Sequence, residues 1–358
     1  MDKNLDFQIE ESMKFYLASG VEEQVDYQKF YLYSIVTHST AIEGSTVTEV
    51  ENQLLFDEGI AAKGRSLSEQ MMNIDLKDAY LHAFKIASEP FLFTSELLQQ
   101  LSAIVMRRTG SEYSMIAGKF DSSKGEFRLC NVSAGVGGKS YLAYYKVPQA
   151  VDEFCKWLNR EISNIAPSDI AACYRLSFEA HFRLVTIHPW VDGNGRTSRL
   201  VMNMIQRRLG LVPSIVRKED KGEYIQSLVD SRESEDSTLA QDVMLRHHIA
   251  NLNLRALQFQ QQDEGASEAN VGENVGVNGK NVGENGKNVG ENVGVKLTDT
   301  QKNVFELIKA NPAVTHSEMA RALSLSIKTI ERATKALREY GLLEREGSAK
   351  SGSWVVLP

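Results

Sequence analysis

One stretch of the chain, residues 188–199, limits its fold and chemistry more than any other. It reads His-Pro-Trp-Val-Asp-Gly-Asn-Gly-Arg-Thr-Ser-Arg and leads into an apolar pattern with helical spacing that starts at Leu200. A loop with two glycines just before a helix leaves several backbone N–H groups without partners and lets a ligand approach closely. Because a helix N-terminus also favours negative charge, the loop predicts a phosphate cradle formed by Gly193, Asn194 and Gly195.

Charged and titratable side chains lie in the same stretch. Arg196 and Arg199 are three residues apart on the predicted helix, so both can reach one anion. Asp192, beside a phosphate cradle, is a hard oxygen ligand that suits Mg²⁺. His188 has an ordinary pKa that suits proton transfer near neutral pH. Together they predict a site for phosphoryl or nucleotidyl transfer, although Gly-Asn-Gly or His-Pro alone is most often an ordinary turn.

The order of these residues resembles the signature of the Fic (filamentation) family, His-Pro-Phe-x-(Asp/Glu)-Gly-Asn-Gly-Arg-x-x-Arg. Every position agrees except Trp190, and that exchange keeps an aromatic anchor for the core. The resemblance implies a protein adenylyltransferase, which transfers AMP from Mg²⁺-ATP to Ser, Thr or Tyr hydroxyls of a target protein and of itself. It implies that His188 is the catalytic base and that Asp192 holds the metal. The glycine loop and both arginines would bind the nucleotide phosphates.

A second run, Ser39-Thr40-Ala41-Ile42-Glu43-Gly44, resembles the inhibitory helix of the same family. Ser39 and Glu43 are one helical turn apart and therefore share a face. The resemblance implies a helix over about residues 30–44 whose Glu43 pairs with Arg199 and takes the room of the ATP γ-phosphate. A carboxylate there repels a triphosphate and occupies an arginine that would otherwise bind it. A single Glu near a helix end is otherwise most often a solvated charge.

Residues 125–147 combine apolar and aromatic residues with a glycine-rich centre. This pattern predicts a β-hairpin with a long tip. Its position resembles the flap of the family, which pairs with a target peptide by strand addition and positions its hydroxyl. The resemblance gives that role to Val132, Ser133 and Ala134. An ordinary edge hairpin is the alternative that the residues alone leave open.

Beyond the signature, the resemblance implies that Tyr224 lines the adenine pocket as a stacking group. The Asn that is common further on in the family is Ser231 here, which weakens a ribose or adenine contact at that point. His181 is predicted to be a core or supporting histidine, because His188 already supplies a base.

Length, charge and cysteine content limit the number of domains, the possible partners and the expected cellular compartment. A length of 358 residues predicts two or three domains. A net charge of −7 argues against a chain-wide role on nucleic acid or on a membrane surface. Cys130, Cys155 and Cys173 lack a metal-binding spacing and are expected to be reduced thiols of a cytoplasmic protein. No signal peptide is expected, because the N-terminal residues are acidic and lack an apolar core. No membrane contact is expected either, because no apolar run approaches about 18 residues.

The expected fold is mainly α-helical, with a Fic-type core, a β-hairpin flap and a small C-terminal winged-helix (α+β) domain. Residues 1–110 are expected to form a helical region that carries the inhibitory helix, and residues 111–260 the Fic catalytic core. Residues 261–295 repeat Asn, Gly and Val without an aromatic residue, so they cannot bury a core and are predicted to be a flexible linker. Residues 296–358 are expected to form the winged helix.

The pattern of residues 296–358 is helix, helix, turn, helix at Ile327–Tyr340 and a hairpin at Leu342–Val356, which resembles a winged-helix domain. The segment holds ten Lys/Arg and seven Asp/Glu, a net charge of +3. Its candidate DNA-facing residues are Lys328, Thr329, Arg332 and Lys350. Winged helices bind DNA but also dock proteins, so both kinds of contact stay open.

The sequence leaves three alternatives to AMP addition open. The same site suits transfer of phosphate, UMP or phosphocholine. The reverse reaction, in which Glu43 activates water to remove AMP from a target, is a second alternative. The third is a transcriptional regulator whose Fic core only senses nucleotide. A homodimer is compatible with each of them.

Overall fold

The structure is a computed structural model that divides the chain into two compact units, Met1–Val275 and Gly276–Pro358. The residues that it describes are 2–134, 139–271, 299–310, 314–316, 318–319, 330, 333–335, 337–338, 342–346 and 353–356. The domain boundaries expected from the sequence stay predictions, apart from the linker start that is corrected below.

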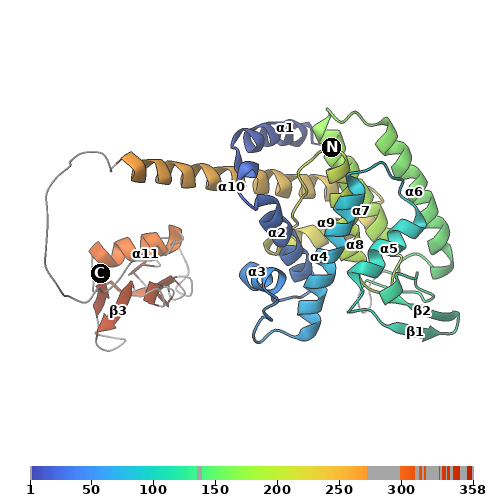
Figure 1. Cartoon of the computed structure of the whole chain (residues 1–358), viewed down its shortest axis with the longest axis horizontal. Helices are drawn as coiled ribbons and strands as arrows, with labels where there is room; N and C mark the ends of the chain where they lie inside the picture. Colours follow the sequence, from blue (N-terminus) through green and yellow to red (C-terminus); the bar gives the residue numbers. More distant parts are fainter. Residues whose placement is uncertain are drawn as a thin grey trace. The chain divides into compact units, whose positions relative to one another are not determined.

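The first unit is mainly α-helical (Figure 1). Its α-helices are α1 (Lys3–Ala18), α2 (Tyr27–Ile42), α3 (Glu49–Asp57), α4 (Leu67–Ala87), α5 (Ser95–Val105), α6 (Val147–Asn164), α7 (Ile170–Ile187), α8 (Asn194–Arg208), α9 (Lys221–Ser234) and α10 (Thr238–Val271). Its 3₁₀ turns are η1 (Val21–Glu23), η2 (Ser122–Lys124), η3 (Tyr144–Lys146) and η4 (Lys218–Asp220).

Helix α8 forms the centre of this unit. It packs against α7 and α4 and is buried almost continuously from Asn194 to Gln206. A helix that is buried on all faces is a core helix, so the first turn of α8 is held rigidly. Trp190, just before it, is fully buried and donates its indole N–H to the carbonyl oxygen of Gly125 at 3.0 Å. The predicted helix after the signature and the predicted aromatic anchor are both confirmed.

A buried polar network ties α2 to α3 and α4. The amide oxygen of Asn73 accepts hydrogen bonds from the Thr40 hydroxyl at 2.8 Å and from the Asn52 amide at 2.9 Å. The same Asn52 amide group donates to the Thr37 hydroxyl at 2.8 Å, and the Asn73 amide donates to the Ser45 hydroxyl at 3.0 Å. Because these groups are buried, they fix the C-terminal end of α2 against its neighbours.

The regular hairpin of this unit lies earlier than the sequence predicts. Strand β1 (Glu112–Met115) pairs antiparallel with β2 (Gly118–Asp121). The predicted hairpin over residues 125–147 is wrong as a pair of regular strands. Its described residues reverse direction with one isolated bridge, Ser133 to Ser140, and then form η3.

Arg128 explains this difference. Its guanidinium is fully buried and donates to the carbonyl oxygens of Cys130 at 2.8 Å and Leu142 at 2.5 Å. The arginine side chain thus bonds to the backbone of both arms of the segment, at points where a regular hairpin would pair the two backbones with each other. The glycine-rich tip, residues 135–138, lies outside the described residues.

The start of the predicted linker also needs correction. Helix α10 continues through residues 261–271, which the sequence analysis assigned to a flexible segment. Residues 261–269 hold Gln, Glu and Ala, which are good helix formers, and this local propensity extends α10 up to the first Asn-Val-Gly repeat. Residues 272–298, the rest of the predicted linker, lie outside the described residues.

The second unit contains α11 (Asp299–Ala310) and an antiparallel pair of strands, β3 (Leu343–Glu346) and β4 (Ser353–Val356). Its core includes Val304, Ile308, Met319, Ile330, Leu337 and Trp354. The helix before and the hairpin after the predicted helix-turn-helix are therefore confirmed. Lys328, Thr329, Arg332 and Lys350, the candidate DNA-facing residues, lie outside the described residues.

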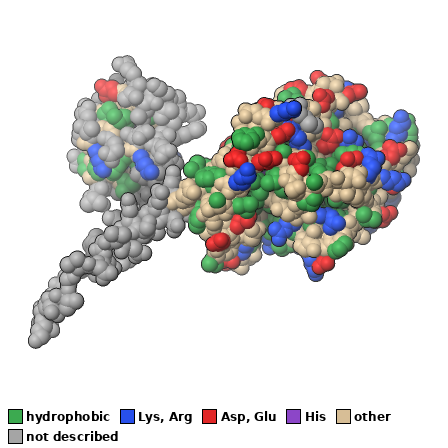
Figure 2. Space-filling view, turned by 90° about the horizontal axis from the view of Figure 1, so that it is seen from above, with side chains coloured by type: hydrophobic (Ala, Val, Ile, Leu, Met, Phe, Trp, Pro, Cys, Tyr) green, Lys and Arg blue, Asp and Glu red, His purple; other side chains and the backbone are tan. Residues whose placement is uncertain are grey.

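The surface of the first unit is mixed in charge. On the face seen in Figure 2, Lys and Arg side chains alternate with Asp and Glu over the described residues. Within the part of the chain that the structure describes, no helix is both long and apolar enough to cross a membrane. The thiols of Cys130, Cys155 and Cys173 are free, as the sequence predicts.

Candidate active site

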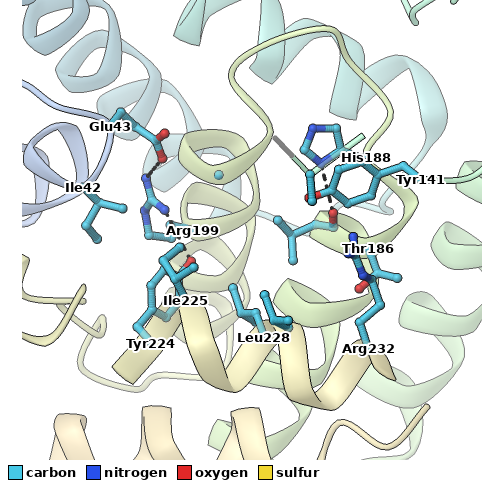
Figure 3. Close-up of a pocket in the computed structure, with 14 residues that line it drawn as sticks. Ile42, Glu43, Tyr141, Thr186, His188, Arg199, Tyr224, Ile225, Leu228 and Arg232 are labelled. Carbon is cyan, nitrogen blue, oxygen red and sulfur yellow. Dashed lines mark hydrogen bonds and ion pairs between the residues drawn. The ribbon is translucent and has the colours of Figure 1, made fainter. Parts of the chain in front are cut away.

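A pocket of about 400 Å³ opens at the N-terminal end of α8 (Figure 3). Side chains from α2, the flap segment, α7, α8 and α9 line it, so it joins segments far apart in the sequence. Six of the predicted site residues lie in its wall: Glu43, Ala134, His188, Gly195, Arg199 and Tyr224. The volume falls in the range of pockets that hold small molecules and cofactors.

His188 ends α7 in a left-handed backbone conformation, with φ of +54°. A non-glycine residue in this region carries strain, which is common at functional sites. Its Nδ1 lies 3.2 Å from the carbonyl oxygen of Val185. Because a carbonyl oxygen only accepts, Nδ1 carries the hydrogen and Nε2 is the nitrogen that can accept a proton.

The electrostatic surroundings keep this imidazole neutral. Burial lowers the pKa of His188 to about 4, and the positive charges of Arg128 and Arg232 act in the same direction. At neutral pH the ring is therefore unprotonated, the form that a general base requires.

The glycine loop is shaped by close contacts. Gly193 has φ of +78°, and a Cβ at this position would lie 2.7 Å from the sulfur of Met106. Asn194 uses its side chain within the loop: its amide donates to the Trp190 carbonyl oxygen at 2.9 Å, and its amide oxygen accepts from the Trp190 N–H at 3.0 Å. The side chain of Asn194 thus holds the loop closed, and a contact to phosphate would come from its backbone.

Asp192 is the most exposed of the predicted residues at the loop, with 61% of its side chain accessible. One carboxylate oxygen accepts from the Gly193 N–H at 2.6 Å, and the other lies 3.5 Å from Arg196. The described residues hold no group of three metal-binding side chains. A single exposed carboxylate fits the way Mg²⁺ binds with nucleotides, where phosphate oxygens and waters supply most ligands.

Arg196 and Arg199 differ sharply in their partners. Arg196 is 2% exposed, and within the described part of the chain its Nε and Nη1 atoms have no hydrogen-bond partner. Its Nη2 lies 3.3 Å from the sulfur of Met106. The Asp192 carboxylate lies 3.5 Å from Nη2 and leaves Nε and Nη1 unsatisfied. Burying unsatisfied donors of a charged group is costly, so these two nitrogens indicate a place for an anion.

Arg199, in contrast, is fully engaged by α2. Its Nη2 lies 2.6 Å from a carboxylate oxygen of Glu43, and its Nε donates to the Ser39 hydroxyl at 2.8 Å. Nη2 also donates to the Ser39 carbonyl oxygen at 3.0 Å, and Nη1 to the Tyr224 hydroxyl at 3.3 Å. The predicted contact between Glu43 and Arg199 is therefore present.

The carboxylate of Glu43 lies directly on the first turn of α8. A Cβ at Gly195 would be 2.5 Å from its oxygen, so a larger residue there would displace the carboxylate from this position. Burial acts to raise the pKa of Glu43, but Arg199 and the further positive charge of Arg196 outweigh this effect and lower it. Glu43 is thus an ionised carboxylate at the position where a helix N-terminus favours an anion.

Tyr224 is buried behind Arg199. Its hydroxyl also lies 2.9 Å from Nε2 of His181, whose pKa burial lowers to about 3. His181 therefore is a neutral supporting group, as predicted. Ser231 is buried, and its hydroxyl accepts from the backbone N–H of Ala240 in α10 at 3.0 Å.

Sequence reasoning missed three residues that surround His188. The ring of Tyr141 stacks on the imidazole, Arg232 lies over the Tyr141 ring, and Arg128 donates to the His188 carbonyl oxygen at 2.8 Å. The flap residues Val132, Ser133 and Ala134 lie in the same segment as Tyr141. No periodic pattern points to these contacts, because they join positions tens of residues apart.

Two regions of the chain match known protein families. Residues 92–206 match the family described as Fic/DOC family, and residues 297–344 match the family described as winged helix-turn-helix DNA-binding. A protein adenylyltransferase Fic of Drosophila grimshawi is 33% identical over 193 residues, which is 53% of this chain and 36% of that protein. Its counterpart in Drosophila mojavensis is 33% identical over 192 residues, 53% and 34% of the two chains. The chain thus spans about a third of the length of these relatives.

Solved structures share the fold. A Fic domain containing signalling protein from Bacteroides thetaiotaomicron VPI-5482 has a TM-score of 0.56 at 19% identity, covering 76% of this chain and 100% of that one. A Fic family protein from Desulfovibrio desulfuricans G20 has a TM-score of 0.55 at 19% identity, covering 99% and 95%. The chain therefore carries a Fic/DOC family domain, followed by a winged helix-turn-helix domain.

Proposed function

We propose that this protein is an adenylyltransferase that transfers AMP from ATP to a hydroxyl group of a protein. One observation carries the proposal: a single pocket joins the neutral imidazole of His188 to the anion-binding first turn of α8. The curated relatives that match this region are named protein adenylyltransferase. Free thiols at three cysteines support a reducing compartment such as the cytoplasm.

In the proposed reaction, Nε2 of His188 accepts the proton of the incoming hydroxyl group. The hydroxyl oxygen bonds to the α-phosphorus, the bond from this phosphorus to the bridging oxygen breaks, and pyrophosphate leaves. Backbone N–H groups of Asn194 and Gly195, at the start of α8, stabilise the negative charge that develops on the α-phosphate. Asp192 would hold Mg²⁺, which supplies positive charge to the phosphates when it is bound with the nucleotide. Arg196 binds the outer phosphates with the donors that are unused here.

The resting protein is inhibited in this proposal. Ser39 and Glu43 hold Arg199, so a triphosphate has to displace the carboxylate before it gains the arginine. Tyr224 and the apolar wall of α9 receive the adenine, and the flap at Val132, Ser133 and Ala134 positions the target peptide.

The test compares Glu43→Gly with the wild type in labelling by radioactive ATP. Because the lost contact is charge-assisted, worth about 1.5–3 kcal/mol, labelling of the protein itself is expected to rise about tenfold or more. Glu58→Gly, an exposed glutamate outside the pocket, is the matched control and is expected to match the wild type. His188→Ala in the Glu43→Gly background is expected to abolish labelling.

Each result decides one part of the proposal. Equal labelling of Glu43→Gly and wild type would remove the inhibitory role of Glu43, and retained labelling in His188→Ala would remove the base. The added mass separates AMP from phosphate, UMP or phosphocholine. Release of AMP from a modified protein, lost in Glu43→Gly, would favour the reverse reaction.

A second candidate function, DNA binding, is favoured by the match of residues 297–344 to a family described as DNA-binding. The net charge of +3 in residues 296–358 points in the same direction. The test is the salt dependence of duplex-DNA binding by the whole chain, with a chain that ends at residue 271 as the control.

A further inference from the structure

A stack of three side chains stands at the flap side of the pocket. The ring of Tyr141 lies on the imidazole of His188, with 3.8 Å between ring centroids and 15° between planes. The guanidinium of Arg232, from α9, lies 4.7 Å from the centroid of the same tyrosine ring. Figure 3 shows His188 and Arg232 on opposite sides of Tyr141. The flap, the signature loop and α9 thus meet at one aromatic ring.

The stack restricts the one rotation that His188 would otherwise retain. The hydrogen bond from Nδ1 to Val185 fixes which nitrogen carries the hydrogen, but it does not hold the whole ring plane. A parallel ring at 3.8 Å blocks rotation of the imidazole about its bond to Cβ. The edge of the imidazole that carries Nε2 stays open, because stacking covers only a face.

Arg128 holds the flap segment and His188 in fixed relation. Its Nε donates to the His188 carbonyl oxygen at 2.8 Å, and its two terminal nitrogens donate to Cys130 and Leu142. Leu142 is the neighbour of Tyr141, whose N–H donates to the Val132 carbonyl oxygen at 3.0 Å. A buried guanidinium with each nitrogen engaged is a rigid bracket. The stack is therefore built on backbone contacts as well as on ring contact.

Arg232 has few other ties. None of the ion pairs within the described residues includes it, and its buried Nε has no hydrogen-bond partner there. Its contact with the Tyr141 ring is a cation–π interaction, which stabilises by about 0.5–2 kcal/mol as it becomes more buried. The contact with the Tyr141 ring is therefore the main interaction of the Arg232 guanidinium among the described residues, and it lies on the side of the ring away from His188.

We propose that Tyr141 is a positioning residue, which fixes the plane of the His188 imidazole, and that Arg232 holds Tyr141 in this place. The proposal rests on the proposed function for its effect on catalysis, but the contacts themselves do not depend on it. The target hydroxyl would then meet an Nε2 whose direction is already set. A displacement of the catalytic nitrogen by about 1 Å can lower the reaction rate by about a hundredfold.

The pKa of His188 is a second measurable quantity that depends on Arg232. Burial lowers its pKa most; Arg128 and Arg232 lower it further, whereas the Val185 carbonyl and Asp192 raise it. Removal of Arg232 is therefore expected to raise the pKa of His188 from about 4 toward its ordinary value. This shift reports the charge of Arg232 near His188, so the orientation of the imidazole is read separately, from the ring signals of His188.

The experiment uses the full chain in the Glu43→Gly background. Tyr141→Ala is expected to lower kcat about tenfold or more and to leave the KM for ATP within about twofold, because the phosphate contacts stay in place. Tyr141→Phe keeps the ring and is expected to keep kcat. Arg232→Leu is expected to lower kcat and to raise the pKa of His188, and Arg232→Lys is expected to restore both in part. Tyr145→Ala, an exposed tyrosine on the same segment, is the control.

NMR titration of His188 in nucleotide-free protein separates this proposal from the proposed function. Changed ring signals of His188 in Tyr141→Ala that Tyr141→Phe restores, and a similar change in Arg232→Leu that Arg232→Lys reduces, support the positioning role even if the parent transfers no AMP. Unchanged His188 signals and pKa in both variants would overturn it. An equal loss of kcat in Tyr141→Phe and Tyr141→Ala would also overturn it, since the ring would then not be the active feature.

Discussion

At the residue scale, the two buried arginines of the signature differ in how many hydrogen-bond partners they have. Arg199 has a carboxylate, a hydroxyl, a carbonyl and a tyrosine as partners, whereas Arg196 keeps two nitrogens without one among the described residues. Arg196 has only the distant carboxylate of Asp192 at one nitrogen, 3.5 Å away, so it gains more from a bound anion than Arg199 does. The two signature arginines thus divide between the resting contact and the ligand.

His248 shows a cost of burial away from the site. It is fully buried in α10 with its ring 4.6 Å from that of Tyr174, and within the described residues neither ring nitrogen has a partner. Burial lowers its pKa to about 3, below the value of about 6.5 in an unfolded chain. The unfolded state therefore binds more protons between these values. The contribution of His248 to stability is complete above pH 6.5 and is lost as the pH falls toward 3.

His248→Phe is expected to raise the free energy of unfolding at pH 7 by about 1 kcal/mol, because two unsatisfied polar atoms disappear. The loss of stability between pH 7 and pH 4 is expected to become smaller than in the wild type. Urea unfolding at several pH values measures both effects, with the exposed His82→Phe as control. An unchanged pH dependence would mean that His248 is not held neutral in the fold.

These residues also show how far sequence reasoning reaches. The resemblance of the signature and of the run around Glu43 to the Fic family implied that Glu43 meets Arg199 at α8, because each run carries a recognisable local motif. Tyr141 and Arg232 belong to no such pattern, and their contact depends on how the flap folds back on α7 and α9. A contact between rings 47 positions apart leaves no trace in helical or strand periodicity.

At the element scale, the accurate predictions were those in which local propensity and burial agree. Helix α8 carried an apolar pattern and became the core helix, and α2 ends beside Gly44, whose φ is +104°. The predicted hairpin over residues 125–147 was wrong as regular strands, and there the Arg128 side chain bonds to the backbone of both arms at Cys130 and Leu142. The linker prediction failed over residues 261–271 because helix formers precede the repeats.

The polar network below α2 makes a prediction about this element. Asn73→Ala is expected to lower the free energy of unfolding by about 2–3 kcal/mol, since it leaves buried groups of Thr40 and Asn52 with fewer partners. Thermal and urea unfolding measure the change, with Lys85→Ala on the exposed face of α4 as the control. A loss equal to that of the control would show that the network does not hold α2 in place.

At the scale of the whole molecule, two units with separate cores carry different chemistry. The first holds the pocket and every described residue of the proposed transfer site. The second combines a net charge of +3 over residues 296–358 with a fold family described as DNA-binding, within a chain of net charge −7. Because the positive charge is confined to the second unit, any contact with the negatively charged DNA backbone is expected there and not on the first unit.

Deletion after residue 271 is expected to leave labelling by ATP in the Glu43→Gly background within about twofold and to abolish duplex-DNA binding. For the whole chain, about three phosphate contacts predict a slope of about −3 in a plot of log affinity against log salt concentration. Fluorescence anisotropy with labelled duplexes measures this slope. Equal DNA binding by both chains would assign the contact to the first unit.

The pairing of Glu43 with Arg199 affects which anions can bind at this arginine. A carboxylate tethered to the same fold occupies the arginine at an effective concentration that free metabolites seldom reach. Under the proposed function, free phosphate or sulfate offers no adenine for the pocket and would have to displace this carboxylate from Arg199 by charge alone. The tethered carboxylate would then favour, at Arg199, a ligand that contacts several walls of the pocket at once.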